Sequence, residues 1–270
     1  MRLPSVEETS SDPFIASLRQ ADSLGYFSQR WGANQKFITT HRFDLCAELI
    51  KKHTNSSPGH NILVGDFACG TANLGINLAE QGYRVDLVEN EAKFFDYIKL
   101  KTDSKNLRFI TADASSHSSK EKYDAIFFGE AIEHMAAPDK VLKLLCENLK
   151  LGGILCLTTP NGRYIDCNEP SWEEVKLNVE RNKKLANTFG NHVCEFTPNE
   201  LQELTKMAGF CIAEHRFILS KQVCKSPLMR RIIPKKILWK LDEKLSKGQD
   251  QKTGKMGGKI QIVIARRARS

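Results

Sequence analysis

The chain has 270 residues, of which 41% are hydrophobic, so it can bury one large core and an accessory segment. No apolar run approaches membrane-spanning length, and residues 1–14 are polar and acidic without an apolar signal core, so we expect a cytoplasmic protein. The eight cysteines are scattered and include no Cys-x-x-Cys pair, which indicates neither a zinc knuckle nor a disulfide framework.

The formal net charge of +8 is unevenly distributed. Residues 221–270 contain fifteen Lys and Arg against three Asp and Glu, whereas residues 1–220 contain 25 against 29. A slightly acidic body disfavours a nucleic-acid partner that wraps the whole surface. The basic tail alone could contact phosphates or an anionic membrane.

Residues 1–55 place several aromatic side chains ahead of a helical pattern that runs from His41 to His53. Two interpretations stay open for this segment, a helical layer packed on the edge of a sheet and a lid over a binding site. Asn55–Gly59 is rich in turn-forming residues and predicts a linker that closes the segment.

The stretch Asn61–Gly75 contains an apolar run that ends in Asp66, a loop of small residues, and a helix that begins near Asn73. This is the pattern of a buried parallel strand that feeds a crossover helix. The loop lacks the Gly-Lys-Ser/Thr of a phosphate loop and the three spaced glycines of a dinucleotide fingerprint. An acid at the strand tip instead suits a ligand with a cationic end, such as the ammonium of an amino acid.

Arg84–Glu89 predicts the next strand, and its terminal Glu89 lies where such folds place an acid that accepts the hydroxyls of an adenosine ribose. Together with Asp66, it indicates a ligand in which an adenosine is joined to an amino acid. Leu107–Ala112 predicts a third strand, directly followed by Asp113. Asp113 could accept a ligand's amino group or cap the following turn.

Tyr123–Gly129 predicts a fourth strand, and the run from Ile154 to Asn161 a fifth. The helix between them has Pro138 at its first turn and Gly152 and Gly153 past its end, in agreement with helix start and stop signals.

The loop after Asp66 resembles motif I of class I S-adenosylmethionine-dependent methyltransferases, whose usual form is Asp/Glu-x-Gly-x-Gly-x-Gly. Glu-Ala-Ile-Glu-His after the fourth strand, Leu-Lys-Leu-Gly-Gly and Thr-Thr-Pro-Asn resemble the ubiquinone-biosynthesis O-methyltransferase branch. The resemblance covers about residues 61–210. Ala68 and Ala72 stand where glycines are usual, so a positive φ at either position would be strained.

This resemblance implies an α/β fold with a Rossmann-like doubly wound sheet, mostly parallel with an antiparallel last strand, between a helical N-terminal lid and a C-terminal insertion. It implies S-adenosylmethionine as cofactor, held by a core of residues 56–220. In that core we expect cofactor contacts from Asp66, Ala68, Gly70, Glu89, Asn90, Asp113, Ala114 and Gly129. Arg42 could reach the cofactor carboxylate or lie on a solvated helix face.

After Asn161 the alternation of strands and helices stops. Residues 162–196 form an insertion at the mouth of the sheet, where substrates bind in such folds, so we expect acceptor specificity to lie here. Thr197–Glu200 is a capping box that opens a helix, and the run from Phe210 to Leu219 predicts a further strand.

Residues 221–258 form a basic insertion and connector, and residues 259–270 the final strand of the sheet. Ser226–Lys247 is amphipathic, and its apolar face holds Ile237, Leu238, Leu241 and Leu245. Packing against the core with a solvated lysine face is one interpretation. The other is peripheral contact with an anionic membrane, for which Trp239 and the lysines are suited.

A sulfonium methyl is already activated, so the protein need only align the acceptor and, for a hydroxyl, remove its proton. His134 and His192 are our candidate bases. The sequence shows no distinctive carboxylate ligand signature, so we expect no metal.

The leading hypothesis is O-methylation of a small-molecule, lipid-linked or glycan hydroxyl. An RNA methyltransferase is favoured only by the basic tail, and the chain has no Asn/Asp-Pro-Pro-Tyr motif. A non-catalytic protein that binds S-adenosylmethionine is the third hypothesis, suggested by Ala68 and Ala72.

Overall fold

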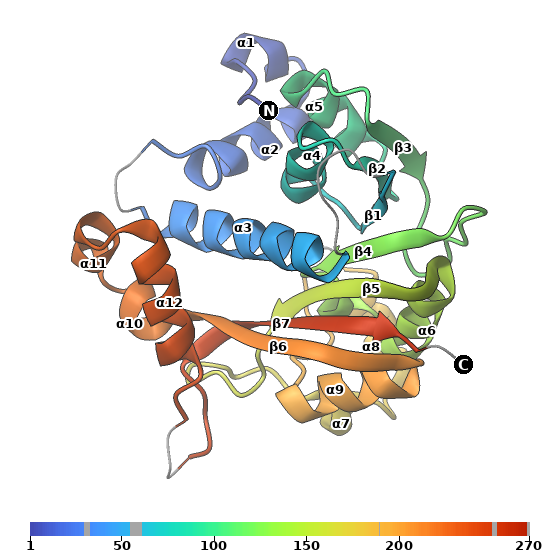
Figure 1. The fold of residues 1–270 in the computed structure, drawn as a ribbon, viewed down its shortest axis with the longest axis vertical. Coiled ribbons are helices and arrows are strands. Elements are labelled where there is room, and N and C mark those ends of the chain that lie inside the picture. Colours follow the sequence, from blue (N-terminus) through green and yellow to red (C-terminus); the bar gives the residue numbers. More distant parts are fainter. Residues whose placement is uncertain (30–32, 55–60, 189, 250–252, 269–270) are drawn as a thin grey trace.

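A computed structural model describes residues 1–29, 33–54, 61–188, 190–249 and 253–268 (Figure 1). In this part of the chain seven strands form one sheet in the order β3-β2-β1-β4-β5-β7-β6. The strands are β1 (Leu63–Phe67), β2 (Arg84–Glu89), β3 (Leu107–Thr111), β4 (Tyr123–Gly129), β5 (Leu149–Pro160), β6 (Phe210–Ser220) and β7 (Gly258–Arg267).

Strands β1 to β5 pair in parallel, whereas β7 runs antiparallel to both of its neighbours, β5 and β6. The predicted mostly parallel sheet with an antiparallel last strand is therefore confirmed. Because β7 opposes both neighbours, β6 runs in the same direction as β5. The carboxyl ends of β1 to β6 consequently meet at one edge of the sheet, where ligands bind in such folds.

Helices cover both faces of the sheet (Figure 1). One face is packed by α3 (Asn34–Thr54), α4 (Asn73–Glu80), α5 (Lys93–Lys101), α10 (Lys221–Cys224) and α12 (Lys235–Ser246). The other is packed by α6 (Pro138–Asn148), α7 (Trp172–Val175) and α9 (Pro198–Met207). The remaining described helices are α1 (Val6–Thr9), α2 (Pro13–Leu24), the 3-10 turn η1 (Ile132–His134), α8 (Val179–Ala186) and α11 (Pro227–Ile232).

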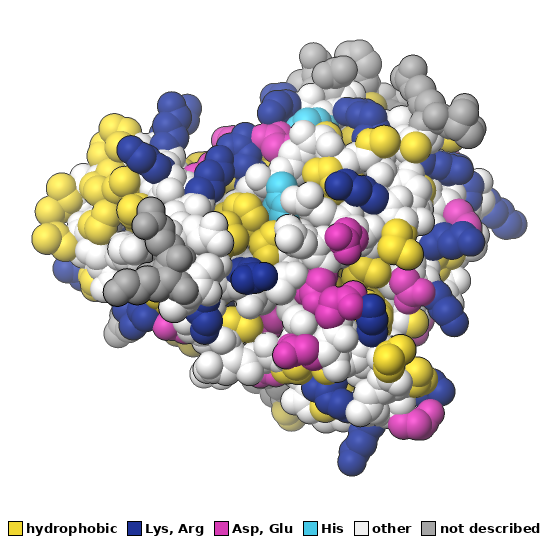
Figure 2. All heavy atoms as spheres, turned by 90° about the horizontal axis from the view of Figure 1, so that it is seen from below, with side chains coloured by type: hydrophobic (Ala, Val, Ile, Leu, Met, Phe, Trp, Pro, Cys, Tyr) yellow, Lys and Arg dark blue, Asp and Glu magenta, His cyan; other side chains and the backbone are white. Residues whose placement is uncertain are grey.

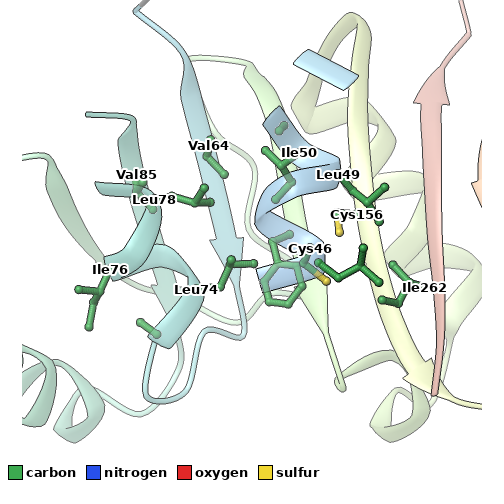
Figure 3. Packing of buried hydrophobic residues seen from close by; sticks show 14 of the residues in the cluster. Cys46, Leu49, Ile50, Val64, Leu74, Ile76, Leu78, Val85, Cys156 and Ile262 are labelled. Atoms are coloured by element: carbon green, nitrogen blue, oxygen red, sulfur yellow. The ribbon is translucent and has the colours of Figure 1, made fainter. Parts of the chain in front are cut away.

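Helix α3 contributes directly to the core. Its Cys46, Leu49 and Ile50 are buried in one cluster with residues of α4, β1 and β5, as Figure 3 shows. This packing agrees with the helical-layer interpretation of the N-terminal segment. The linker predicted at Asn55–Gly59 lies outside the described residues.

The predicted amphipathic segment Ser226–Lys247 is not one continuous helix. It divides into α11 and α12 around Ile233 and Pro234, because proline has no N–H to donate and disfavours helical backbone in the residue before it. Within the described ranges, none of the helices is both long and apolar enough to cross a membrane.

Candidate active site

The loop between β1 and α4 is held in a strained conformation. Ala68, Gly70 and Ala72 have φ angles of 52°, 50° and 51°, in the left-handed region that favours glycine. The strain expected at the two alanines is therefore present. Gly75 lets α4 pack closely on the strands, because a Cβ there would lie 2.7 Å from Asp66 Oδ2 and 2.6 Å from Leu87 Cδ2.

Replacing Ala68 with glycine should raise the free energy of unfolding by about 1 kcal/mol, since the left-handed conformation costs an L-residue about 1–2 kcal/mol. The greater conformational entropy of glycine in the unfolded chain offsets part of this gain. Ala72→Gly is the matched comparison. It relieves the same φ but removes a buried methyl group, so its gain should be smaller. Urea unfolding of both variants measures the effect, and a loss of stability in Ala68→Gly would contradict the strain argument.

Asp66 lies buried at the tip of β1, beneath this loop. Its Oδ2 accepts a hydrogen bond from the Gly75 N–H at 3.1 Å. Burial raises the pKa of the carboxyl well above its usual range, and the charge of nearby Glu89 adds to this effect. A cation beside Asp66 would favour the ionised form, so the position fits the ammonium group predicted from the sequence.

Glu89 ties the end of β2 to the same loop. Its Oε2 accepts from the Gly70 N–H at 3.0 Å, and its Oε1 accepts from the N–H groups of Asn90 and Glu91 at 2.9 and 3.3 Å. A carboxylate offers about four lone-pair sites, so one remains on Oε2. The carboxylate can therefore hold the loop and still accept a hydroxyl group.

The other predicted cofactor residues lie at the same edge of the sheet. Asp113 follows β3, is exposed, and accepts the Ser115 N–H at 2.7 Å, so it caps the turn and keeps a second carboxylate oxygen for a ligand. Ala114 is buried beside it, Asn90 is exposed next to Glu89, and Gly129 ends β4. Direct contact of these residues with the cofactor stays a prediction.

A second polar cluster lies after β4. Glu130 has a φ of 51°, and its carboxylate pairs with the Arg42 guanidinium of α3 at 3.1 Å. Arg42 is thus neither on a solvated face nor unpaired. Glu133 is buried and accepts the Thr159 hydroxyl at 2.8 Å. Its burial and the charge of Glu130 raise the pKa of Glu133 well above the usual range.

The structure brings His134 and His192 together, with ring centroids 4.9 Å apart. The link is a backbone hydrogen bond, in which the Val193 N–H donates to the Glu133 carbonyl at 2.7 Å. His134 Nδ1–H donates to the Asn191 carbonyl at 2.7 Å, and His192 Nδ1 lies 3.3 Å from Glu195 Oε1. Both rings are therefore fixed through Nδ1, which leaves each Nε2 for another partner.

Glu133, His134 and His192 each offer a ligand atom, and these atoms lie within 4.8 Å of one another. Imidazole nitrogens with their other ring nitrogen bonded to a carboxylate or carbonyl are typical of metal sites. Burial lowers the pKa of His134, whereas the hydrogen bond to the Glu195 carboxylate raises the pKa of His192. These three side chains could therefore hold a cation, whereas the sequence predicts no metal.

The fold and these acidic strand tips define a class I S-adenosylmethionine-dependent methyltransferase. A family model described as "Methyltransferase domain" matches residues 58–244, and the chain belongs to that family. The chain is 25% identical over 193 residues to a ubiquinone biosynthesis O-methyltransferase of Hydrogenovibrio crunogenus. This match covers 68% of the present chain and 76% of the relative.

Another similar protein is named as a methyltransferase that acts on nitrogen. An (S)-coclaurine N-methyltransferase of Thalictrum flavum is 27% identical over 46% of this chain and 37% of its own length. A solved S-adenosylmethionine-dependent methyltransferase of Mesorhizobium loti superposes with a TM-score of 0.56 at 15% identity, over 83% of this chain and all of that one. This structural likeness confirms the fold.

The chain is accordingly an S-adenosylmethionine-dependent methyltransferase, and its own residues fit that cofactor.

Glu89→Ala should weaken binding of S-adenosylmethionine by about 1–3 kcal/mol, because it removes a charged acceptor from buried polar groups. Calorimetry measures the change, with Glu91→Ala as the neighbouring exposed control. Unchanged affinity in Glu89→Ala would remove Glu89 from the cofactor site.

Proposed function

We propose that this methyltransferase transfers the methyl group to a hydroxyl oxygen of an acceptor bound beside Glu133, His134 and His192, with a divalent cation held by these three side chains. The observation that carries the proposal is the convergence of three ligand atoms within 4.8 Å, two of them on η1, which follows β4, the neighbour of β1 in the sheet. The O-methyltransferase relative, which matches 68% of the chain, favours oxygen as the acceptor atom.

S-adenosylmethionine supplies an electrophilic sulfonium methyl, and a divalent cation lowers the pKa of an oxygen bound to it. The residues of the chain bind and orient the reacting groups. The Gly70 loop and Glu89 hold the cofactor end of the site, while Asn191 and Glu195 fix the two imidazoles. In the transfer the sulfur–carbon bond breaks, a carbon–oxygen bond forms, and the hydroxyl proton leaves to solvent or a nearby base.

Histidine as general base, the role expected from the sequence, is the alternative for this site. In that role Nε2 of His134 or His192 takes the hydroxyl proton directly, and a cation is not needed. The two roles differ in one observable, because activity that depends on a base alone is indifferent to a chelator.

The acceptor can be identified with methyl-labelled S-adenosylmethionine and a fractionated cell extract. Mass spectrometry of the labelled product should find the methyl group on oxygen of a small-molecule, lipid-linked or glycan hydroxyl. Label on nitrogen, or only in RNA, would contradict the proposal.

A further inference from the structure

Helices α10 to α12 stand at the active-site edge of the sheet. They follow β6, whose carboxyl end lies at the same edge as the ends of β1, β4 and β5. Figure 1 shows α11 and α12 beside the N-terminal end of α3. A surface on these helices is therefore close to the part of the molecule where an acceptor must enter.

The inner side of α12 is fixed to the core. Leu238 is buried, and the buried Asp242 carboxylate accepts from the N–H groups of Leu219 and Ser220 at 2.7 and 2.8 Å. Asp242 also lies 3.2 Å from His41 Nε2 of α3. This part of the segment agrees with the packing interpretation of the sequence.

The outer side is apolar where a solvated helix would be polar. Leu228 and Ile232 of α11 are 65% and 68% exposed, and α11 has no buried residue. Ile237 of α12 is 59% exposed, so this residue of the predicted apolar face does not pack against the core as Leu238 does. Figure 2 shows hydrophobic side chains gathered at the end of the molecule where Figure 1 places α11.

Exposed lysines lie next to this apolar surface. Lys240 and Lys244 follow Ile237 by three and seven residues, so the three side chains share one side of α12. Lys236 is exposed at the same end of the helix. Figure 2 shows Lys and Arg side chains close to the hydrophobic group. Apolar side chains beside lysines are the composition of a surface that lies in the headgroup region of an anionic bilayer.

A pocket of about 450 Å³ opens between α3 and the same helices. Its apolar lining includes Phe37, Ile233 and Trp239, and Lys36 and Lys235 belong to its lining. Lys235 stacks over the Trp239 ring at 4.5 Å and pairs with Asp44 at 2.6 Å. The pocket adds concave apolar surface next to the exposed patch.

We propose that the surface formed by Leu228, Ile232, Ile237, Lys236, Lys240 and Lys244 docks this methyltransferase on an anionic lipid bilayer, with its active-site edge toward the membrane. Charge complementarity selects the occupant, since residues 221–247, which form these helices, carry nine basic against two acidic side chains. The proposal goes beyond the proposed function and uses none of its residues.

Sedimentation with lipid vesicles tests the proposal without any acceptor. The full chain should sediment with vesicles of phosphatidylglycerol and phosphatidylcholine but not with phosphatidylcholine alone. Combined Lys236→Gln, Lys240→Gln and Lys244→Gln should weaken the binding by roughly 100-fold. Each lysine near an anionic surface contributes about 1 kcal/mol of binding free energy, and the three contributions add. Combined Leu228→Ser, Ile232→Ser and Ile237→Ser should weaken it by at least about tenfold.

Two matched controls isolate the surface. Lys105→Gln, Lys120→Gln and Lys143→Gln remove the same charge at other exposed positions, and Leu177→Ser and Met207→Ser remove apolar groups that are 89% and 83% exposed elsewhere. Both controls should bind vesicles like the unaltered chain. Retained binding of S-adenosylmethionine in every variant shows that the protein is folded.

Equal sedimentation with both vesicle types, or none with either, would overturn the proposal. So would anionic binding that the lysine variant loses and the apolar variant keeps. In that case retention of RNA at physiological salt, lost in the same lysine variant, would identify a phosphate polymer as the partner. Methyl transfer to a water-soluble acceptor is unaffected by either result, so the two proposals can fail separately.

Discussion

Glu133→Gln is expected to lower kcat by at least about 100-fold, because it removes the buried carboxylate ligand of the proposed cation site. The affinity for S-adenosylmethionine should stay within about threefold, since the predicted cofactor residues Asp66 and Glu89 lie on other strands and are unchanged. His134→Ala and His192→Ala should each lower kcat by about 10²–10⁴-fold, the range that also applies to loss of a general base. Steady-state kinetics on the identified acceptor measures these effects.

Binding of Mn²⁺, followed by electron paramagnetic resonance, separates the ligand role from the base role. The cation should bind the unaltered protein and be lost in Glu133→Gln. Glu174→Gln changes an exposed glutamate in the same insertion and should alter neither cation binding nor kcat. A protein that binds no cation and loses activity only in the histidine variants would return His134 and His192 to the role of bases.

Lys101→Met is expected to lower the free energy of unfolding by about 3–5 kcal/mol, the usual cost of removing one partner of a buried ion pair. The Lys101 ammonium is buried and lies 2.8 Å from Asp22 of α2, 2.8 Å from the Thr71 carbonyl and 2.6 Å from Asn73 Oδ1. Loss of the ammonium leaves the buried Asp22 carboxylate with only neutral donors, from Tyr97 and Asn73. Urea unfolding measures the change.

Lys99→Met is the matched control for this variant. Lys99 lies on the same helix, its side chain is 59% exposed, and its ion pair with Asp96 spans 3.5 Å, so the cost should stay below about 0.5 kcal/mol. Adding Asp22→Asn to Lys101→Met removes the unpaired charge and should recover part of the loss. Equal effects of Lys99→Met and Lys101→Met would show that the buried network does not stabilise the fold.

The sequence predicts that three acidic residues lie at one edge of the sheet, and this placement has a physical reason. Parallel strands end at one edge of a sheet, so Asp66, Glu89 and Asp113 could be placed there from three successive strand patterns without knowledge of their contacts. The left-handed backbone at Ala68 and Ala72 follows from the same loop pattern. The sequence does not predict the backbone partners of Glu89, because the Gly70 N–H that donates to its carboxylate belongs to the loop after β1.

The proposed cation site is not evident from the sequence, because its contacts are not local. Glu133 and His192 are far apart in the sequence, and the Val193 N–H that joins the two segments carries no side-chain signal. The Glu-Ala-Ile-Glu-His run supplies adjacent carboxylate and imidazole groups, which was the available hint. The exposure of Ile237 is likewise not evident from the sequence, since the spacing of apolar residues does not show that Leu238 and Asp242 fix α12 to the core.

Methyl transfer by chelator-treated protein to the identified acceptor tests the cation site and the reaction together, when it is measured with labelled S-adenosylmethionine before and after Mg²⁺ is restored. The chelated protein should bind S-adenosylmethionine but transfer almost no label, and Mg²⁺ should restore transfer to the acceptor oxygen. Full transfer in the presence of the chelator would contradict the cation site, and transfer to nitrogen would contradict the proposed reaction.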